Sequence, residues 1–473
     1  MWIIIIAVFI TSLFSHVHTT VPWPPKSSYI TQKVDHFNYG PINLTYQMRY
    51  LYEDRWFCCR HGPIFFYCGN EGPIESFWNN SGYIFDLAEK MNALVVFGEH
   101  RYYGESLPFR KAFQQPFIQF LSINQAMADF AHLLSTLKLK FNRTDVPIVA
   151  FGGSYGGMLA AYMRVRYPHI VSGAISSSAP VISLAGSGKF HRFFEAVTED
   201  FRTSQPSCES RIREAYTELL NIQNKPQEWF SLSQKLHICL PIQTISDFQW
   251  MMKWTRNAFV MMAMMDYPYR TSFMAPLPAY PVNVSCERAL AAPDAITALR
   301  EAIGVFYNDS GVTQCFDFKN QYIECADITG CGLGNDSLAW DFQSCTEMKL
   351  HDNSNATERD MFPSLPLTSD AVTKYCESRW GVTPDFDKLA TEFGPEIWKT
   401  ASNILFVNGD LDPWMPGGVL HDVSRSVRSI TLHGGAHHLD LRSPHPNDPP
   451  SAHVVRKDIA KTIRHWIHHK HVY

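Results

Sequence analysis

The sequence lacks any long hydrophobic run after residues 2–14, so the rest of the chain offers no candidate for a membrane-spanning helix. It also lacks a basic run or stripe, and its net charge is −4, which argues against a nucleic-acid-binding surface. No Cys-x₂-Cys pair recurs with the partner spacing of a zinc site, and there is no internal repeat or low-complexity tract. What remains is a globular chain of 473 residues, enough for two domains or for one domain with a large insertion.

The N-terminus has the pattern of a targeting segment. Residues 2–14 are almost wholly apolar and residues 15–20 are small or polar, which predicts a signal peptide over residues 1–19. No Lys or Arg precedes the apolar run, and the alternative is an uncleaved anchor, although the run is short for a bilayer. Sequons for N-glycosylation begin at Asn43, Asn79, Asn142, Asn283, Asn308, Asn335 and Asn355. Together these features predict a glycoprotein of the secretory pathway with no membrane attachment after processing.

The eleven cysteines are distributed unevenly. Eight of them fall in one region, at positions 208, 239, 286, 315, 325, 331, 345 and 376. In an oxidising compartment this cluster predicts four disulfides, whose pairing is open among 105 connectivities. Cys58, Cys59 and Cys68 are odd in number, so at least one thiol is expected to be free.

The stretch over residues 147–157 organises the chain. The apolar run 148–151 predicts a buried strand, and residues 158–167 predict a helix that stops at Pro168. Between them, residues 152–156 fit G-x-S-x-G with Ser154 at the centre. Strand, sharp turn and helix are the context of a nucleophile elbow, in which Ser154 attacks and the Tyr155 N–H faces the developing oxyanion. The alternative is a simple Gly-Ser turn between a strand and a helix.

Further strands and helices alternate around the elbow. Strands are expected over residues 43–52, 63–67, 93–98, 170–175, 403–407 and 428–432, and helices over residues 81–91, over 123–137 behind a Ser122/Gln125 capping box, and from Ser451 onward. This alternation predicts an α/β fold with a mostly parallel sheet covered on both faces. Residues 185–375 show helical patterns and most of the cysteines, which predicts an inserted helical cap. The predicted domains are therefore a hydrolase part over 20–184, the cap over 185–375 and a second hydrolase part over 376–473.

A serine nucleophile needs a base, and the base needs an acceptor that orients it. The two strands that follow the cap end in candidates for both: Asp410 or Asp412 after the first, and His433, His437 or His438 after the second. Spacing alone leaves these alternatives open. A second oxyanion donor is expected in the stretch 69–72, with Gly69 as the first candidate.

Several motifs together carry a resemblance to one known family. They are Gly-Asn-Glu-Gly at 69–72, Glu-His-Arg-Tyr-Tyr-Gly-Glu-Ser-Leu-Pro at 99–108, Gly-Gly-Ser-Tyr-Gly-Gly-Met-Leu at 152–159, Leu-Asp-Pro-Trp at 411–414 and Gly-Ala-His-His-Leu-Asp-Leu-Arg at 435–442. The chain resembles the serine peptidase family that contains lysosomal Pro-X carboxypeptidase and dipeptidyl peptidase II. The resemblance implies an α/β-hydrolase fold, a triad of Ser154, Asp412 and His437, an S1 pocket lined by Met158 and Trp414, and no cofactor or metal. It also implies lysosomal residence and a homodimer.

The motifs of the predicted cap most resemble the dipeptidyl peptidase II branch of this family. In the loop Cys-Ala-Asp-Ile-Thr-Gly-Cys-Gly at 325–332, the resemblance implies that Asp327 holds the free N-terminus of a peptide substrate. The alternative is that Asp327 only caps a turn, and Glu71 likewise has a structural and a substrate-binding interpretation. The predicted function is a serine exopeptidase that releases Xaa-Pro or Xaa-Ala dipeptides.

Three other functions compete with this prediction. The nearest is a Pro-X carboxypeptidase, which needs a cation for the substrate's C-terminal carboxylate and for which Arg442 is a candidate. The others are an esterase or lipase on the same fold and a binding module on an inactive hydrolase scaffold.

Overall fold

The computed structural model describes residues 23–39, 43–57, 62–187, 190–351 and 359–468. The predicted signal peptide, Cys58, Cys59 and Asn355 lie outside these residues. The strands are β1 (Lys26–Lys33), β2 (Thr45–Glu53), β3 (Ile64–Cys68), β4 (Leu94–Gly98), β5 (Ile148–Gly153), β6 (Gly173–Ser177), β7 (Ile404–Gly409) and β8 (Val427–Leu432). They form one eight-stranded sheet in the order β1-β2-β4-β3-β5-β6-β7-β8.

The sheet is parallel from β4 to β8, and only β2 runs against its neighbours. Strands β3, β4 and β5 are buried at every position, because helices cover both faces and leave no side for water. The chain passes from β3 outward to β4 and then returns to β5 on the other side of β3. This reversal marks the switch point of the sheet, and ligands bind at the carboxyl ends of the strands beside such a point in open α/β sheets.

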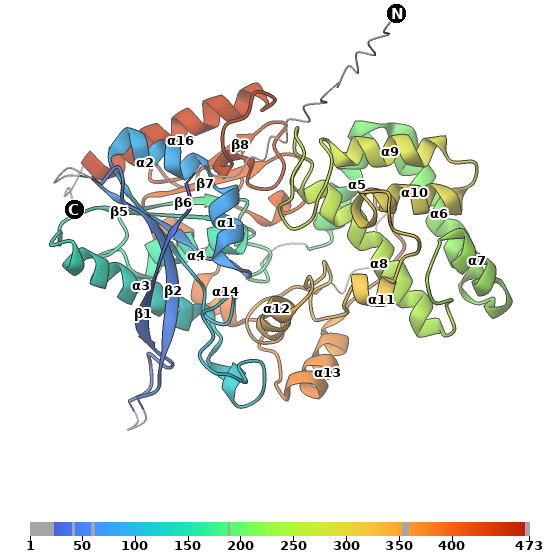
Figure 1. The fold of residues 1–473 in the computed structure, drawn as a ribbon, viewed down its shortest axis with the longest axis horizontal. Coiled ribbons are helices and arrows are strands. Elements are labelled where there is room, and N and C mark those ends of the chain that lie inside the picture. The colour runs from blue at the N-terminus through green and yellow to red at the C-terminus, as the bar shows by residue number, and fades with distance from the viewer. Residues whose placement is uncertain (1–22, 40–42, 58–61, 188–189, 352–358, 469–473) are drawn as a thin grey trace, which may run out of the picture.

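Two layers of helices enclose the sheet (Figure 1). Helices α2 (Tyr83–Met91) and α16 (Pro450–His468) lie on one face, and α3 (Ile123–Lys140) and α4 (Tyr155–Arg166) lie on the other. The inner face of α16 fits closely: a Cβ added to Gly173 on β6 would lie 2.3 Å from the ring of Trp466. The strand order and the two helical layers are those of the α/β-hydrolase fold, and the predicted fold class is confirmed.

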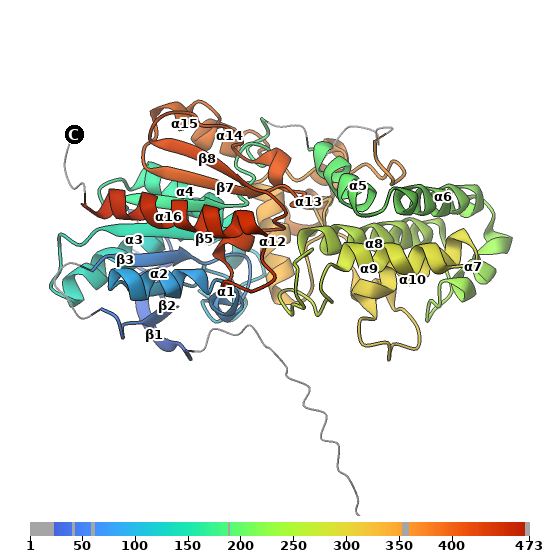
Figure 2. The ribbon, with the colours of Figure 1, turned by 90° about the horizontal axis from the view of Figure 1, so that it is seen from above.

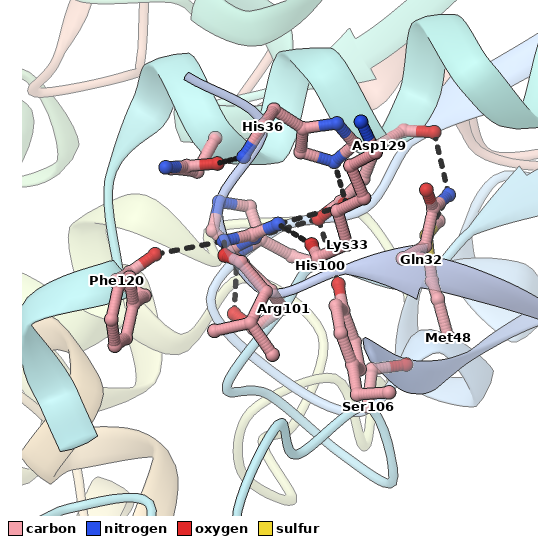
Figure 3. Close-up of polar contacts among 12 residues, drawn as sticks. Gln32, Lys33, His36, Met48, His100, Arg101, Ser106, Phe120 and Asp129 are labelled. Carbon is pink, nitrogen blue, oxygen red and sulfur yellow. Dashed lines mark hydrogen bonds and ion pairs between the residues drawn. The ribbon is translucent and has the colours of Figure 1, made fainter. Parts of the chain in front are cut away.

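A buried ion pair fastens the end of β4 to helix α3 (Figure 3). The guanidinium of Arg101 donates to both carboxylate oxygens of Asp129, at 2.6 and 2.8 Å. His36 and Tyr46 also donate to Asp129, each at 2.7 Å, so both oxygens of this buried carboxylate have hydrogen-bond donors. Helix α3 begins at the predicted cap, where the Ser122 hydroxyl accepts from the Gln125 N–H. The segment after β4 is therefore held rigidly against α3.

The chain between β6 and β7 is helical and forms a second body beside the hydrolase part (Figures 1 and 2). Its helices are α5 (Arg192–Ser204), α6 (Pro206–Gln223), α7 (Trp229–Lys235), α8 (Ile245–Met264), α9 (Pro281–Ala291), α10 (Ala295–Tyr307) and α11 (Phe318–Gln321). Helices α12 (Asn335–Thr346) and α13 (Ser369–Trp380) lie between this body and the hydrolase part. Helices α14 (Lys388–Phe393) and α15 (Ile397–Thr400) pack on the hydrolase part, where the rings of Phe393 and Trp398 stack on Tyr162 of α4. Short 3₁₀ turns lie at Phe117–Phe120, Pro226–Glu228, Met415–Gly417 and Leu439–Leu441.

The eight clustered cysteines form four disulfides, as predicted: Cys208–Cys286, Cys239–Cys315, Cys325–Cys331 and Cys345–Cys376. Cys68, at the end of β3, is a buried free thiol. No helix in the described ranges is long and apolar enough to cross a membrane.

Several elements of the hydrolase part were not predicted from the sequence, among them β1, α1 (Ile74–Asn80) and the short helices α14 and α15. Strand β1 is the true edge strand, and the segment predicted as an edge strand is β2, one place further in. β1 was missed because its side chains are mostly exposed or half-buried and carry little hydrophobic signal. Helix α1 is a two-turn helix that follows the loop after β3.

Candidate active site

The turn between β5 and α4 has the geometry of a nucleophile elbow. Ser154 has φ 57° and ψ −128°, a strained conformation for a residue with a side chain. The turn is possible because its flanks are glycines: a Cβ on Gly152 would lie 2.0 Å from the Gly156 carbonyl oxygen, and one on Gly156 would lie 2.1 Å from Oδ1 of Asn70. Ser154 therefore stands at the carboxyl end of the central strand, at the switch point of the sheet.

The loop after β3 is attached directly to this turn. Asn70 donates through Nδ2 to the Gly153 carbonyl oxygen at 2.6 Å, and its Oδ1 accepts from the Tyr67 hydroxyl at 3.0 Å. Asn70 is buried, so these hydrogen bonds fix both loops relative to each other. The sequence analysis did not single out Asn70, although it lies inside the Gly-Asn-Glu-Gly motif. Its neighbour Glu71 is thereby held beside the nucleophile turn.

The loops after β7 and β8 contain two Asp–His pairs of the same design. His437 Nδ1 lies 2.8 Å from Asp412 Oδ2, and His433 Nδ1 lies 2.9 Å from Asp410 Oδ2. Burial separates them, because the first pair has side chains 3% and 0% exposed, whereas the His433 side chain is 78% exposed. A carboxylate can only accept, so Nδ1 of His437 carries the proton and Nε2 is left as a base. The structure thus distinguishes a buried orienting pair from a surface pair.

The loop that carries His437 packs against the nucleophile turn. A Cβ placed on Gly153 would lie 2.7 Å from the ring of His438, the residue after His437. The backbone N–H of His437 donates to the Met264 carbonyl oxygen at 3.1 Å, and its carbonyl accepts from the Tyr267 hydroxyl at 2.8 Å. Both residues belong to the segment at the end of α8, so the helical body positions the backbone of this histidine. The sequence alone did not predict this role, because Tyr267 and His437 lie 170 residues apart in the chain.

The two predicted oxyanion donors differ in their surroundings. Tyr155 is the first residue of α4, where a backbone N–H has no partner within the helix. The Gly69 N–H instead donates to the Gly98 carbonyl oxygen at 3.0 Å, as part of the β3–β4 ladder. The prediction that Gly69 supplies the second donor is therefore wrong, because β3 pairing extends one residue further than expected. Tyr155 stays a predicted donor.

Glu71 lies within electrostatic range of both His437 and Asp327. Burial raises the pKa of Glu71 to about 7; the nearby His437 opposes this increase and the Asp327 carboxylate adds to it. Oε2 of Glu71 is buried and has no hydrogen-bond partner in the described part of the chain. Glu71 therefore has one buried oxygen left for a further hydrogen-bond donor.

Asp327 is 3% exposed and is held at both oxygens. Oδ1 accepts from the Thr329 N–H and hydroxyl, each at 2.7 Å, and Oδ2 accepts from Trp340 Nε1 at 2.8 Å. The turn-capping interpretation therefore describes Oδ1. A carboxylate has about four acceptor positions, so Oδ2 retains room for one more donor. Burial raises the pKa of Asp327 to about 6, although the hydrogen bonds from Trp340 and Thr329 oppose this.

A small pocket opens beside Asp412. It is lined by the rings of Phe190, Phe193, Pro413, Trp414 and Pro416. The Trp414 ring packs 4.6 Å from that of Phe193, and its Nε1 atom is buried with no partner among the described residues. Met158 is fully buried and does not line this pocket. The pocket therefore supports the predicted S1 position of Trp414 but not that of Met158.

The described residues contain one cluster with the spacing of a metal site, Cys325, Cys331 and Asp341. Its two sulfur atoms are bonded to each other and cannot act as thiolate ligands. Of the predicted glycosylation positions, Asn43, Asn79, Asn142 and Asn335 are exposed, whereas Asn283 and Asn308 are half-buried. The latter two donate or accept hydrogen bonds within the fold, with Glu287 and Thr313 respectively.

Comparison with known families agrees with this geometry. Residues 32–459 match the family model described as serine carboxypeptidase S28. The chain belongs to the S28 family of serine peptidases. Lysosomal Pro-X carboxypeptidase of Bos taurus is 39% identical to this chain over 446 residues, covering 93% of this chain and 87% of that protein. The Homo sapiens protein of that name is 38% identical over 93% of this chain and 88% of its own length.

More distant relatives extend the comparison. Thymus-specific serine protease of Homo sapiens is 26% identical over 94% of this S28 chain and 87% of its own. Among solved structures, proline iminopeptidase of Mycobacterium smegmatis aligns with a TM-score of 0.38 at 11% identity, covering 93% of this chain and 98% of that one. The match to the family model over residues 32–459 makes this chain a serine peptidase, and the expected family is confirmed. Its specificity within the family is a separate question.

Proposed function

We propose that this S28 peptidase is a dipeptidyl peptidase that removes Xaa-Pro or Xaa-Ala from the free N-terminus of peptides. The observation that carries the proposal is Asp327, a buried carboxyl group held in place by Thr329 and Trp340, together with Glu71, whose buried Oε2 has no partner among the described residues. A buried carboxylate with a vacant acceptor position selects an ammonium group, because the charge-assisted hydrogen bond is strong in a low dielectric. The same two groups repel the C-terminal carboxylate of a short peptide.

The proposed reaction uses the residues of this site in sequence. Ser154 Oγ attacks the carbonyl carbon of the second substrate residue and gives its proton to His437 Nε2, while Asp412 keeps the imidazole oriented. The Tyr155 N–H donates to the oxyanion. His437 then protonates the leaving amine, and a water molecule hydrolyses the acyl-enzyme. The substrate ammonium stays on Asp327 and Glu71 during both steps.

A second candidate is a Pro-X carboxypeptidase, and the similarity to proteins of that name favours it. It needs a cation for the substrate carboxylate, and Arg442 is the candidate. Its Nη1 atom is buried without a partner among the described residues, although its Nε donates to Tyr269 and its Nη2 to Thr271.

The compartment follows from the same observations. Four disulfides form and persist in an oxidising environment, and the two Pro-X carboxypeptidases named above are lysosomal by name. We infer that the protein enters the secretory pathway and acts in the lysosome.

The two candidates are separated by the end of the peptide that must be free. Purified enzyme is incubated with Lys-Pro and Lys-Ala fluorogenic amides, with their N-acetylated forms, and with a peptide ending in Pro-Phe as free acid or amide. We expect cleavage of the free-amine amides only. Asp327→Asn should lower kcat/KM about 10- to 100-fold, since a hydrogen bond between charged groups is lost. Asp294→Asn, the same change at the N-cap of α10 in the helical body, is the matched control. Release of Phe from the free acid, with the amides intact, would establish the carboxypeptidase instead.

A further inference from the structure

Helix α12 lies between the helical body and the hydrolase part (Figure 1). Its polar side chains contact both. On one side Trp340 donates to Asp327 at 2.8 Å, and Asp341 Oδ1 accepts from the N–H of Ala326 at 2.8 Å. These bonds tie the loop that carries Asp327 to the helix at two consecutive positions.

On its other side α12 binds the nucleophile elbow. Gln343 is fully buried and donates through Nε2 to the Tyr155 hydroxyl at 2.9 Å, and its Oε1 accepts from the Tyr103 hydroxyl at 2.6 Å. The ring of Trp340 packs edge-on against Tyr155 with centroids 5.4 Å apart. One residue, Tyr155, therefore receives both contacts from α12 and is covalently joined to Ser154.

The Tyr155 hydroxyl is held from behind as well. His100 Nδ1 lies 2.7 Å from the Arg101 carbonyl oxygen, which can only accept, so Nδ1 carries the proton. Nε2 then accepts from the Tyr155 hydroxyl at 3.0 Å, and the Tyr155 oxygen is free to accept from Gln343. Burial lowers the pKa of His100 to about 4, which keeps it neutral in this role. The donor directions are thus consistent along the whole chain, and Arg101 is itself fixed by Asp129 (Figure 3).

The far end of α12 has its own anchor. Glu347 accepts from the Ile123 N–H, the first of helix α3, at 2.9 Å, and from Lys388 Nζ at 3.1 Å. An acidic side chain at a helix N-terminus is favourable, and this one is buried. Helix α12 is therefore fixed to the hydrolase part at two points, four residues apart.

We propose that Gln343 and Trp340 are positioning residues that fix the distance between Asp327 and Ser154, and so set the length of the released product at two residues. The inference rests on the proposed function, because it takes Asp327 as the ammonium site. An added substrate residue moves the ammonium by about 3.5 Å along an extended chain. A rigid α12 cannot follow that shift, whereas a loosened α12 can.

The test compares Gln343→Met and Trp340→Phe with wild type on two peptides with free N-termini, one with Pro at position two and one with Pro at position three. The first variant removes the bonds to Tyr155 and Tyr103, and the second removes the bond to Asp327 while keeping an aromatic ring. We expect kcat/KM for dipeptide release to fall about tenfold in each variant. The ratio of tripeptide to dipeptide released should rise about tenfold, which general destabilisation would not produce.

Two controls accompany these variants. Tyr216→Phe removes a buried hydroxyl elsewhere in the helical body, where it donates to Thr255, and should leave the product ratio unchanged. The rate of Ser154 labelling by a fluorophosphonate, which needs no ammonium, should match wild type in Tyr216→Phe, and in the other two variants it reports any change at the nucleophile itself. Unchanged product ratios in both variants would overturn the positioning role while leaving the proposed function intact. A wild-type enzyme that releases no dipeptide would overturn the proposed function and this inference with it.

Discussion

At the scale of the residue, the loops after β7 and β8 contain two Asp–His pairs that differ mainly in burial. Both histidines lie under 3 Å from their carboxylates. The buried pair excludes water and holds one tautomer of His437, whereas the exposed pair competes with solvent and is worth little.

These pairs give a direct test of the triad. Asp412→Asn should lower kcat by up to about 10⁴-fold, because an amide in place of the carboxylate favours the wrong tautomer of the base. Asp410→Asn, the same change in the exposed pair, should leave kcat within about twofold of wild type. Steady-state kinetics on a fluorogenic amide measure both. A large loss in Asp410→Asn would assign the catalytic histidine to His433 instead.

Asp327 and Glu71, the two carboxyl groups proposed to bind the substrate ammonium, predict how substrate affinity depends on pH. Both have raised pKa values, about 6 for Asp327 and about 7 for Glu71, so both gain protons as the pH falls. A neutral carboxyl attracts an ammonium weakly, and KM for a free-amine substrate should therefore rise as the pH falls below about 6. KM is measured from pH 4.5 to 7 in wild type and in the double variant Asp327→Asn, Glu71→Gln. The rise in KM should be absent in the double variant. The same rise in the double variant would place the titrating group elsewhere.

At the scale of the element, the conformation of the short loop 325–331 is fixed by several independent bonds. The Cys325–Cys331 bond closes it, Asp341 holds Ala326, and the Ile328 N–H donates to the Leu350 carbonyl oxygen at 3.0 Å. Since the closed loop is small, the bond constrains the unfolded chain modestly and serves mainly to fix the position of Asp327.

Removing this disulfide should therefore affect binding more than folding. The double variant Cys325→Ser, Cys331→Ser should lose no more than about 2 kcal/mol in stability, and its KM for a free-amine dipeptidyl amide should rise severalfold. Thermal unfolding and steady-state kinetics report the two effects. The double variant Cys239→Ser, Cys315→Ser removes a disulfide that closes a much longer loop, with a sequence separation of 76, and that does not enclose the Asp327 loop. It should show the reverse result, a larger loss of stability with KM unchanged. Equal KM values in both double variants would contradict the role of the loop.

At the scale of the whole molecule, several buried carboxyl groups have raised pKa values because burial disfavours their charged form. The values are about 7 for Glu71 and Asp266 and about 6 for Asp327 and Asp440, and the pKa of Asp200 is raised well above its usual range. Between pH 4 and these values the folded protein keeps protons that the unfolded chain has released, so stability falls as the pH rises. His100 and His438, whose pKa values burial lowers, act in the opposite direction only below about pH 6.5.

The melting temperature should therefore decrease by several degrees between pH 5.5 and pH 8, as suits a protein of an acidic compartment. Asp266→Asn keeps an oxygen that accepts from the Val282 N–H but cannot ionise, and it should show a smaller decrease. The exposed Asp370→Asn should behave as wild type. Calorimetry at several pH values measures all three proteins. A melting temperature that rises toward pH 8 would contradict the assignment of these buried groups.

Local sequence determined much of this protein. The elbow around Ser154, the cap of α3 and most strands could be predicted because they depend on neighbours in the chain: glycines that permit close approach, a hydroxyl three residues from its N–H, and runs of apolar side chains. The oxidised state of the clustered cysteines followed from their number and their region. Strand β1 could not be predicted in this way, because its exposed side chains give no periodic signal.

Only the tertiary structure decided which groups meet across long separations. It paired Asp412 with His437 and left Asp410 and His433 at the surface, and it removed Gly69 from the oxyanion site by pairing it with Gly98. It also brought Gln343 to Tyr155, residues 188 apart in the sequence, and chose one set of disulfides among many. The physical reason is that burial and hydrogen-bond partners depend on how separate elements pack, and residue type and spacing do not encode this locally.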